Sequence, residues 1–219
     1  RCPTDRSTVL HLAAASGNLE LVKSILTLYP ESERFCAVTS RDMRQRTVLF
    51  MAVISENLEL IKFILMLFPE FQRLQVMDMH NSEGETALHF VARRGNIEAL
   101  KLVLMFYPES KRLQAMLMKD RSESTVLHRV ACLDNPESIR FLLSFVPEEM
   151  RLQAVETRDG FGCTVLHMAV RSKNFDTIEA ILEWIPELQR WPAVNLRDRI
   201  GRTVLNSSSK IVRGSIMEL

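Results

Sequence analysis

The chain has 219 residues, of which 47% are hydrophobic and 25% are charged, and this composition excludes a disordered chain, a collagen and a disulfide scaffold. Its 28 Lys and Arg residues nearly balance its 27 Asp and Glu residues, so the formal net charge is +1. Any attraction to nucleic acid or to an anionic membrane must therefore come from the distribution of the charges rather than from their sum.

The cysteines indicate free thiols in a reducing compartment, because they form no C-x-x-C pair and no evenly spaced framework. No apolar stretch reaches the roughly 20 residues that a membrane helix needs, and no signal peptide is visible. We therefore expect a cytoplasmic protein, and we expect a piece of a longer chain because the sequence begins at Arg1 rather than at Met. The four cysteines are Cys2, Cys36, Cys132 and Cys163.

The chain repeats itself with a constant period of 39 residues, which predicts stacked structural repeats. Each repeat begins T-[VA]-L-[HFN], and the five full copies continue through small residues to an Asn at a fixed phase. This pattern predicts a short helix that ends in a polar turn. We expect five full repeats and a truncated sixth, all in a single domain over residues 1–219. The threonines that open the repeats are Thr8, Thr47, Thr86, Thr125, Thr164 and Thr203.

Two more helices are expected in each full repeat. After the turn of the first repeat, Leu19, Val22 and Leu26 have the spacing of one buried helical face, and the second repeat keeps this pattern. An in-phase proline ends this second helix, because proline removes a backbone donor and disfavours helix in the residue before it. The pattern P-E-x-x-R then predicts a brief third helix, since proline suits a first helical turn. The prolines are Pro30, Pro69, Pro108, Pro147 and Pro186.

The arginine of the P-E-x-x-R pattern has two interpretations. It either caps a helix or bridges neighbouring repeats, which would be a structural role, or it belongs to a row of anion-binding groups. These arginines are Arg34, Arg73, Arg112, Arg151 and Arg190.

A polar connector joins each third helix to the next threonine. Asp or Asn lies five residues before the threonine and Gly often lies two before it, so we expect a hairpin-like finger. In one connector, Asp159-Gly160-Phe161-Gly162 contains the D-F-G letters of protein kinases, but the companion Lys and Asn motifs are missing. We therefore interpret this segment as a finger turn.

The T-x-L-H-x-A pattern, the two antiparallel helices and the V-N-x-x-D-x-x-G-x-T segment that ends at Thr203 together resemble the ankyrin repeat over essentially the whole chain. The resemblance implies an all-α, ankyrin-like helical repeat solenoid with short finger loops. The repeats here are about six residues longer than the common 33, so an extra short helix per repeat is expected. The family's T-P-L-H also has Val or Ala in place of Pro, as at Val9 and Ala87.

The resemblance carries expectations about function as well. Ankyrin arrays as a rule bind proteins, so we expect a non-catalytic protein-interaction module with no cofactor and no bound metal. The histidines three residues after the repeat threonines are expected to hydrogen-bond backbone between repeats, and they lie a whole repeat apart, too far to share a metal ion. These histidines are His11, His89, His128 and His167.

Ligands of the family usually lie on the concave face made by the finger tips and the exposed end of the first helix. At these phases the chain has nine basic residues against three acidic ones, with apolar residues between them. We therefore predict a protein partner with an acidic or acidic-apolar segment, although arginines on a solvent face also serve solubility. The predicted binding face comprises Arg44, Arg46, Ile54, Arg93, Arg94, Arg121, Arg129, Leu133, Phe161, Arg171 and Arg199.

Other functions remain open at this stage. The extended repeats are similar to those of translocated effectors of intracellular bacteria, which would place the protein in the host cytosol after secretion. The chain could then be the substrate-recruiting domain of a larger multidomain effector enzyme. Nucleic acid and membrane lipid fit less well, because Glu83 and Glu85 interrupt the basic row and no aromatic residues alternate with it. No small-molecule substrate is expected, and Ser207-Ser208-Ser209 predicts a polar cap or a cut edge.

Overall fold

The computed structural model describes residues 6–173 and 175–206, and within these ranges the chain forms fifteen α-helices and no β-strand. One isolated antiparallel bridge joins Arg197 and Thr203. The backbone groups into two compact halves, residues 1–109 and residues 110–219. The all-α helical repeat class predicted from the sequence is confirmed, whereas the expectation of a single domain stays a prediction. No described helix is long and apolar enough to cross a membrane.

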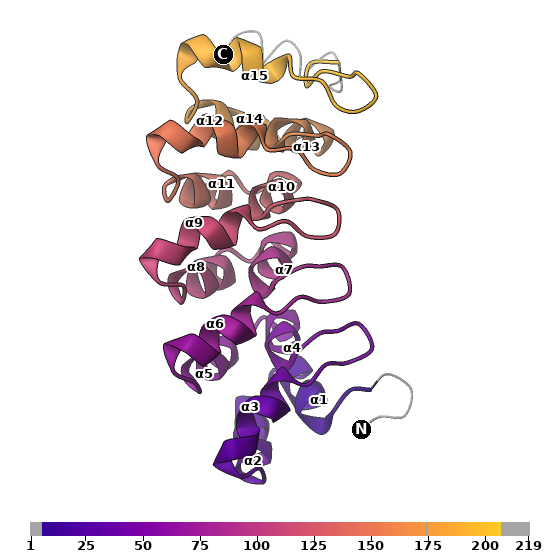
Figure 1. The fold of residues 1–219 in the computed structure, drawn as a ribbon, viewed down its shortest axis with the longest axis vertical. Helices are drawn as coiled ribbons and strands as arrows, with labels where there is room; N and C mark the ends of the chain where they lie inside the picture. The colour runs from indigo at the N-terminus through magenta and orange to yellow at the C-terminus, as the bar shows by residue number, and fades with distance from the viewer. Residues whose placement is uncertain (1–5, 174, 207–219) are drawn as a thin grey trace. The chain divides into compact units, whose positions relative to one another are not determined.

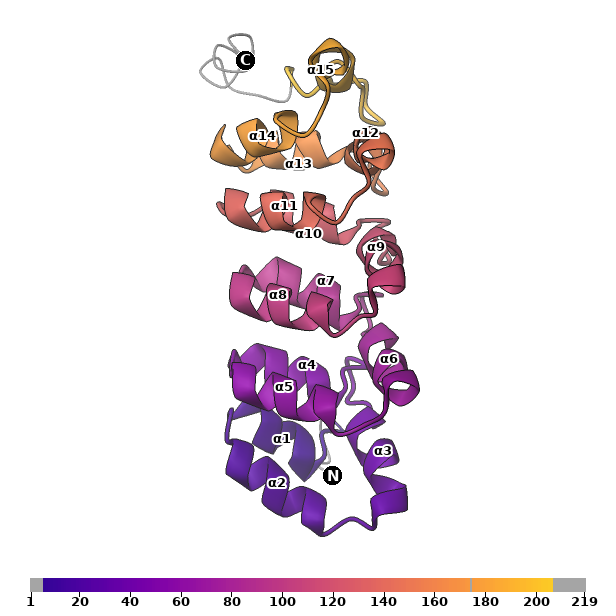
Figure 2. The ribbon, with the colours of Figure 1, turned by 90° about the vertical axis from the view of Figure 1, so that its left-hand side faces the viewer.

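Each of the five full repeats contributes three helices, as the sequence predicts. Within each half, the third helices lie to one side of the paired first and second helices (Figures 1 and 2). The first helices are α1 (Val9–Ala15), α4 (Val48–Ser55), α7 (Ala87–Arg94), α10 (Val126–Ala131) and α13 (Val165–Arg171). The second helices are α2 (Leu19–Thr27), α5 (Leu58–Met66), α8 (Ile97–Met105), α11 (Pro136–Leu143) and α14 (Phe175–Leu182). The third helices are α3 (Glu31–Thr39), α6 (Glu70–Asp78), α9 (Glu109–Leu117), α12 (Glu148–Glu156) and α15 (Glu187–Val194).

Repeated polar residues set where these helices begin. The threonine that opens each full repeat is the N-cap of the first helix, and the in-phase asparagine, where the structure describes it, is the N-cap of the second. Asn57 Oδ1, for example, accepts the backbone N–H of Leu60 at 3.0 Å and so satisfies a donor that has no partner inside the helix. Pro30 occupies the N-cap of the third helix, and Pro69 does so in the next repeat.

The core lies between the three helices of a repeat and those of its neighbours in the same half. The leucine two residues after the threonine of each full repeat is almost fully buried, and each such side chain contributes about 1.5–3 kcal/mol to folding. The second helices bury their predicted apolar face in part, because Val22 and Leu26 are buried but Leu19 is only half-buried. The leucines are Leu10, Leu49, Leu88, Leu127 and Leu166.

The connectors form the predicted fingers. In the first, the Asp42 N–H donates to the Arg46 carbonyl at 3.0 Å, and the same closure recurs in every finger. The residue two before the threonine has positive φ in all five fingers, not only where it is glycine: φ is 58° at Gln45 and 73° at Gly162. Neighbouring fingers are joined within a half, because the Ser82 N–H donates to the Arg44 carbonyl at 2.8 Å.

The third helices bridge neighbouring repeats through the arginine of the P-E-x-x-R pattern. In the second, third and fourth repeats, its guanidinium lies over an aromatic ring two residues before the proline of the next repeat. The distances to the ring centroids are 5.4 Å for Arg73 over Phe106, 5.5 Å for Arg112 over Phe145 and 4.4 Å for Arg151 over Trp184. These contacts support the bridging interpretation of the pattern over the anion-binding one.

The repeat histidines join repeats as expected. His11 Nδ1 lies 2.8 Å from Thr8 Oγ1, and its Nε2 lies 3.1 Å from the Arg46 carbonyl at the start of the next repeat. His128 and His167 make the same contacts. Burial, partly offset by the carbonyl hydrogen bonds, lowers the pKa of these two imidazoles, which favours the neutral form.

The second repeat departs from this arrangement, because Phe50 stands where the other full repeats have histidine. Phe50 is fully buried and meets Phe90 edge to face with 5.5 Å between ring centroids. The hydroxyl of Thr47 is buried there without a hydrogen-bond partner. The sixth repeat is described only to residue 206, so the interpretation of Ser207–Ser209 as a cap or edge lies outside the described residues.

Candidate protein-binding surface

The structure places the predicted binding residues on fingers, on first helices or just after a first helix. In residues 1–109, Arg44 and Arg46 lie in a finger, Ile54 lies near the end of α4, and Arg93 and Arg94 form the last turn of α7. In residues 110–219, the finger residues are Arg121, Phe161 and Arg199, and the first-helix residues are Arg129, Arg171 and, after the end of α10, Leu133.

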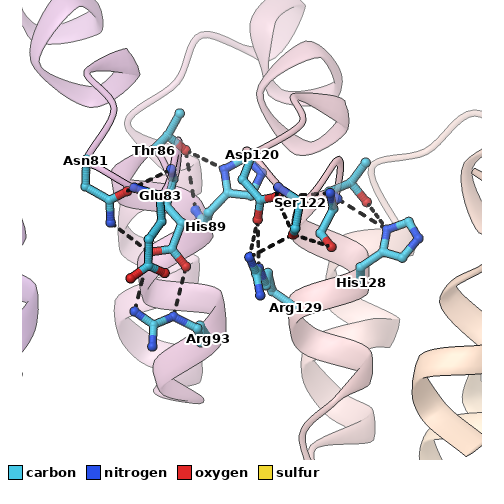
Figure 3. Close-up of polar contacts among 12 residues, drawn as sticks. Asn81, Glu83, Thr86, His89, Arg93, Asp120, Ser122, His128 and Arg129 are labelled. Atoms are coloured by element: carbon cyan, nitrogen blue, oxygen red, sulfur yellow. Dashed lines mark hydrogen bonds and ion pairs between the residues drawn. The ribbon is translucent and has the colours of Figure 1, made fainter. Parts of the chain in front are cut away.

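Two of the predicted arginines in residues 1–109 are held by carboxylates buried in the fingers. Arg46 contacts Asp42 Oδ2 at 2.7 Å, while Asp42 Oδ1 accepts two finger amides, those of Arg44 and Arg46. Arg93 Nε donates to Glu85 Oε1 at 2.9 Å (Figure 3). The guanidinium of Arg93 also lies over the ring of Phe90. The Glu85 side chain has no solvent exposure, so Arg93 supplies the positive charge that a buried carboxylate needs.

In residues 110–219, a similar pair joins Asp120 to Arg129 (Figure 3). Asp120 Oδ1 accepts the backbone amides of Ser122 and Ser124 at 2.8 and 3.1 Å. Burial would raise the pKa of Asp120, but hydrogen bonds from Ser122 and Arg129 and the Arg129 charge outweigh it and lower the pKa. The carboxylate therefore stays ionised at neutral pH.

The same opposing effects, burial and hydrogen bonding, set the pKa of the carboxylate in the last finger. Burial would raise the pKa of Asp198, but hydrogen bonds from Arg202 and Ile200 lower it overall. Arg202 Nε lies 3.0 Å from Asp198 Oδ2. A finger carboxylate with an arginine partner is thus a recurrent feature of the chain.

These pairs correct the charge balance expected from the sequence. The count of nine bases against three acids treated the finger aspartates as turn residues only, whereas Asp42, Asp120 and Asp198 each hold an arginine. Arg94 is also paired, with Glu56 at 3.1 Å. Four arginines of the predicted face have no ion pair with a described residue, namely Arg44, Arg121, Arg171 and Arg199.

Exposed apolar side chains lie in the same fingers as two of these arginines, Arg44 and Arg199. Met43, Phe161 and Ile200 lie in the fingers and expose 60%, 66% and 71% of their surface. Ile54 and Leu133 are half-buried beside the first helices. Large apolar side chains beside arginines are typical of protein-binding surfaces.

One cavity of about 430 Å³ opens among these residues in the C-terminal half. Phe161, Arg199 and Ile200 contribute to it from two neighbouring fingers, and Cys163 and Arg171 also line it. The closest approach there brings an Arg171 terminal nitrogen within 4.0 Å of the Cys163 sulfur. The cavity is thus basic and partly apolar.

Chemistry other than binding has little support among the described residues. Burial raises the pKa of the Cys132 and Cys163 thiols, which opposes a nucleophilic role. The described cysteines are free, as expected, and Cys2 lies outside the described residues. No group of three or more His, Cys, Asp or Glu side chains in residues 6–173 and 175–206 could hold a metal ion. The Asp159-Gly160-Phe161-Gly162 segment is a finger turn, as predicted, in which Asp159 Oδ1 accepts the Phe161 and Cys163 amides.

The fold and these fingers define a helical repeat protein. Comparison with protein families identifies the repeats: residues 49–104 match a model described as ankyrin repeats (many copies), and residues 5–29 match one described as ankyrin repeat. The chain contains ankyrin repeats, and these repeats indicate a protein-interaction module. No curated protein gives a match close enough to serve as a relative.

Proposed function

We propose that the chain binds an acidic-apolar segment of a partner protein through its fingers and first helices. The observation that carries this proposal is the coincidence of two features on the fingers: arginines without an ion pair to described residues, and large exposed apolar side chains. Arg44 follows Met43 directly, and Arg199 precedes Ile200. A partner that supplies carboxylates and apolar side chains would satisfy both.

The two kinds of residue have different roles in this proposal. The exposed apolar side chains supply most of the affinity, because they leave water when the partner binds. The unpaired arginines attract and orient an acidic segment, which raises the association rate and favours acidic partners over basic ones. We propose a cytosolic setting on the strength of the free thiols at Cys36, Cys132 and Cys163.

The paired arginines support the same surface in another way. Arg93 and Arg129 are fixed by buried carboxylates, so their guanidinium groups lose little freedom when a partner contacts them. A surface that is already ordered binds with a smaller entropic cost than one that orders on binding. In this proposal, the module acts without catalysis and without a cofactor.

The test is a pull-down from cell lysate with the chain as bait, read out by mass spectrometry. The test variant is Arg44→Glu with Arg121→Glu, because both residues are exposed and neither has an ion pair with a described residue. The matched control is Lys62→Glu with Lys111→Glu, which makes the same charge change on second and third helices. Circular dichroism establishes that each bait is folded.

Reversal of Arg93 is the poorer test, although the sequence alone recommends it. Glu at position 93 would face the buried Glu85 carboxylate and destabilise the fold, which would confuse loss of binding with loss of structure. We expect a protein with an acidic binding segment to be captured by the chain and by the control but not by the test variant. Equal capture by the test variant would contradict the proposal.

A further inference from the structure

Two positions of the repeat form a charge pair in one repeat and not in another. Glu85, directly before the threonine of the third repeat, holds Arg93, seven residues after that threonine. The same two positions in the fifth repeat contain Cys163 and Arg171. Cys163 thus stands where the carboxylate would be, and Arg171 has only the sulfur at 4.0 Å. The fifth repeat therefore has the arginine of this pair but, among the described residues, no carboxylate paired with it.

The space around Arg171 is open. The cavity of about 430 Å³ is lined by Arg171, Cys163 and the fingertip residues Phe161, Arg199 and Ile200. Cys163 lines this cavity, and its side chain is shorter than the glutamate side chain at the same position of the third repeat. Phe161 and Ile200 give the cavity an apolar rim, since they expose 66% and 71% of their surface.

The neighbouring acids are already engaged. Asp198 lines the cavity, but its Oδ2 holds Arg202 at 3.0 Å and its Oδ1 accepts finger amides. Asp159 accepts two finger amides through Oδ1 and does not line the cavity. Arg171 and Arg199 therefore face the cavity without a carboxylate partner among the described residues.

We propose that this cavity binds a glutamate or aspartate side chain of the partner segment, whose carboxylate pairs with Arg171 as Glu85 pairs with Arg93. The inference rests on the proposed function and specifies where the acid of the partner is bound. Arg199 also lines the cavity and adds positive charge, while apolar side chains next to the acid contact Phe161 and Ile200. Arginine suits this role because its planar guanidinium can donate two parallel hydrogen bonds to a carboxylate.

The probes are fluorescein-labelled pentapeptides with a central Glu and apolar flanks, acetylated and amidated so that the ends carry no charge. Each has a partner peptide with Gln in place of Glu, and fluorescence polarisation gives both dissociation constants. We expect about tenfold or more tighter binding of the best Glu peptide than of its Gln counterpart, as for a charge-assisted hydrogen bond. A free dicarboxylate, glutarate, serves as competitor to separate a small anion from a peptide.

Three variants locate the preference. Cys163→Glu places a carboxylate in the chain beside Arg171 and should abolish the preference for the Glu peptide. Arg171→Gln should abolish it as well, and it decides the question if Cys163→Glu does not fold. Arg121→Gln is the matched control, because it removes an exposed arginine without an ion pair from the same half and should leave the preference unchanged.

Several outcomes would overturn this inference. One is a Glu preference that persists in Arg171→Gln, and another is a chain that shows no Glu preference. Displacement of a peptide by glutarate at a concentration no higher than that of the peptide would indicate a small-molecule site instead. A preference that is lost in Arg121→Gln but kept in Arg171→Gln would leave the proposed function standing and reject the cavity, so the two failures are distinguishable.

Discussion

The finger side and the third-helix side of each repeat both use arginine, but they give it different partners. In the fingers, Arg46 and Arg129 pair with the buried carboxylates of Asp42 and Asp120. In the third helices, Arg151 lies over the ring of Trp184 in the next repeat. The first arrangement depends on ionised acids, whereas the second depends on stacking. The same residue type therefore makes one side of the protein sensitive to pH and the other insensitive.

Acid should produce the largest effect, and it should act through the histidines of the first helices and the carboxylates of the fingers. His128 and His167 have lowered pKa values because they are buried, so the unfolded chain binds protons near pH 6.5 that the folded chain does not bind. Stability should fall as the pH drops below about 6.5. A second loss should begin below about pH 3.9, because hydrogen bonds outweigh burial and lower the pKa of Asp120 and Asp198.

Denaturant unfolding at a series of pH values checks this prediction. The variant His128→Phe, which copies the natural Phe50, should weaken the loss of stability in the upper pH range and leave the lower one in place. The same slope in both proteins above pH 5 would argue against the histidine contribution.

Removal of one finger carboxylate should have the next largest effect. Asp120→Ala leaves the amides of Ser122 and Ser124 without their acceptor and Arg129 without its counter-ion. We expect a loss of about 2–4 kcal/mol in the free energy of unfolding. Asp120→Asn keeps an oxygen for the amides and should lose less. Urea denaturation measures both variants, and equal losses would show that the charge carries the whole effect.

Removal of one third-helix arginine should lower the free energy of unfolding by a smaller amount. Arg151→Ala loses the contact over Trp184 and a hydrogen bond from Nε to the Val146 carbonyl at 3.3 Å, so we expect about 1–2 kcal/mol. The loss should be the same at pH 5 and pH 8, because neither the guanidinium of Arg151 nor the indole of Trp184 titrates in this range. A loss that changes between these two pH values would contradict the distinction between the two sides.

Substitution of a finger residue whose φ is in the left-handed region should have the smallest effect, and this effect should be an increase in stability. Gln45 has φ 58° at the phase where Gly84 and Gly162 have positive φ. Gln45→Gly should therefore stabilise the chain by about 0.5–1 kcal/mol, because an L side chain is strained there. Thermal unfolding measures the change. Gly162→Ala is the converse, since a Cβ would lie 2.9 Å from the Arg199 backbone nitrogen, and it should lower the melting temperature.

The architecture of the repeats was accessible from the sequence because it depends on residues that recur every 39 positions. Threonine, histidine, asparagine and proline at fixed phases predicted three helices per repeat, and the structure has them. The asparagine was assigned only to a turn, whereas Asn57 caps the second helix. The cap could have been foreseen, since asparagine directly before an amphipathic helix is a preferred N-cap.

The charge pairs of the candidate site were not accessible in the same way. Glu85 and Arg93 are eight residues apart and cross from a finger to a helix, so no helical spacing rule brings them together. The third-helix contacts could have been inferred from the sequence, because the arginine and the aromatic residue are 33 positions apart in all three contacts. The identity of position 163 as cysteine gained meaning only once its neighbour Arg171 was located.

The joints between repeats also restrict how the length of this protein can change. His11 contacts the carbonyl of Arg46, and Arg41 donates to the carbonyl of His80. Each joint between repeats therefore requires a fixed sequence spacing between its two partners. A deletion of a few residues inside one repeat would change this spacing and disturb the joints of that repeat with its neighbours. Loss or duplication of a complete repeat would not, because the new neighbours present the same atoms at the same phase. The length of this protein can therefore change only by complete repeats.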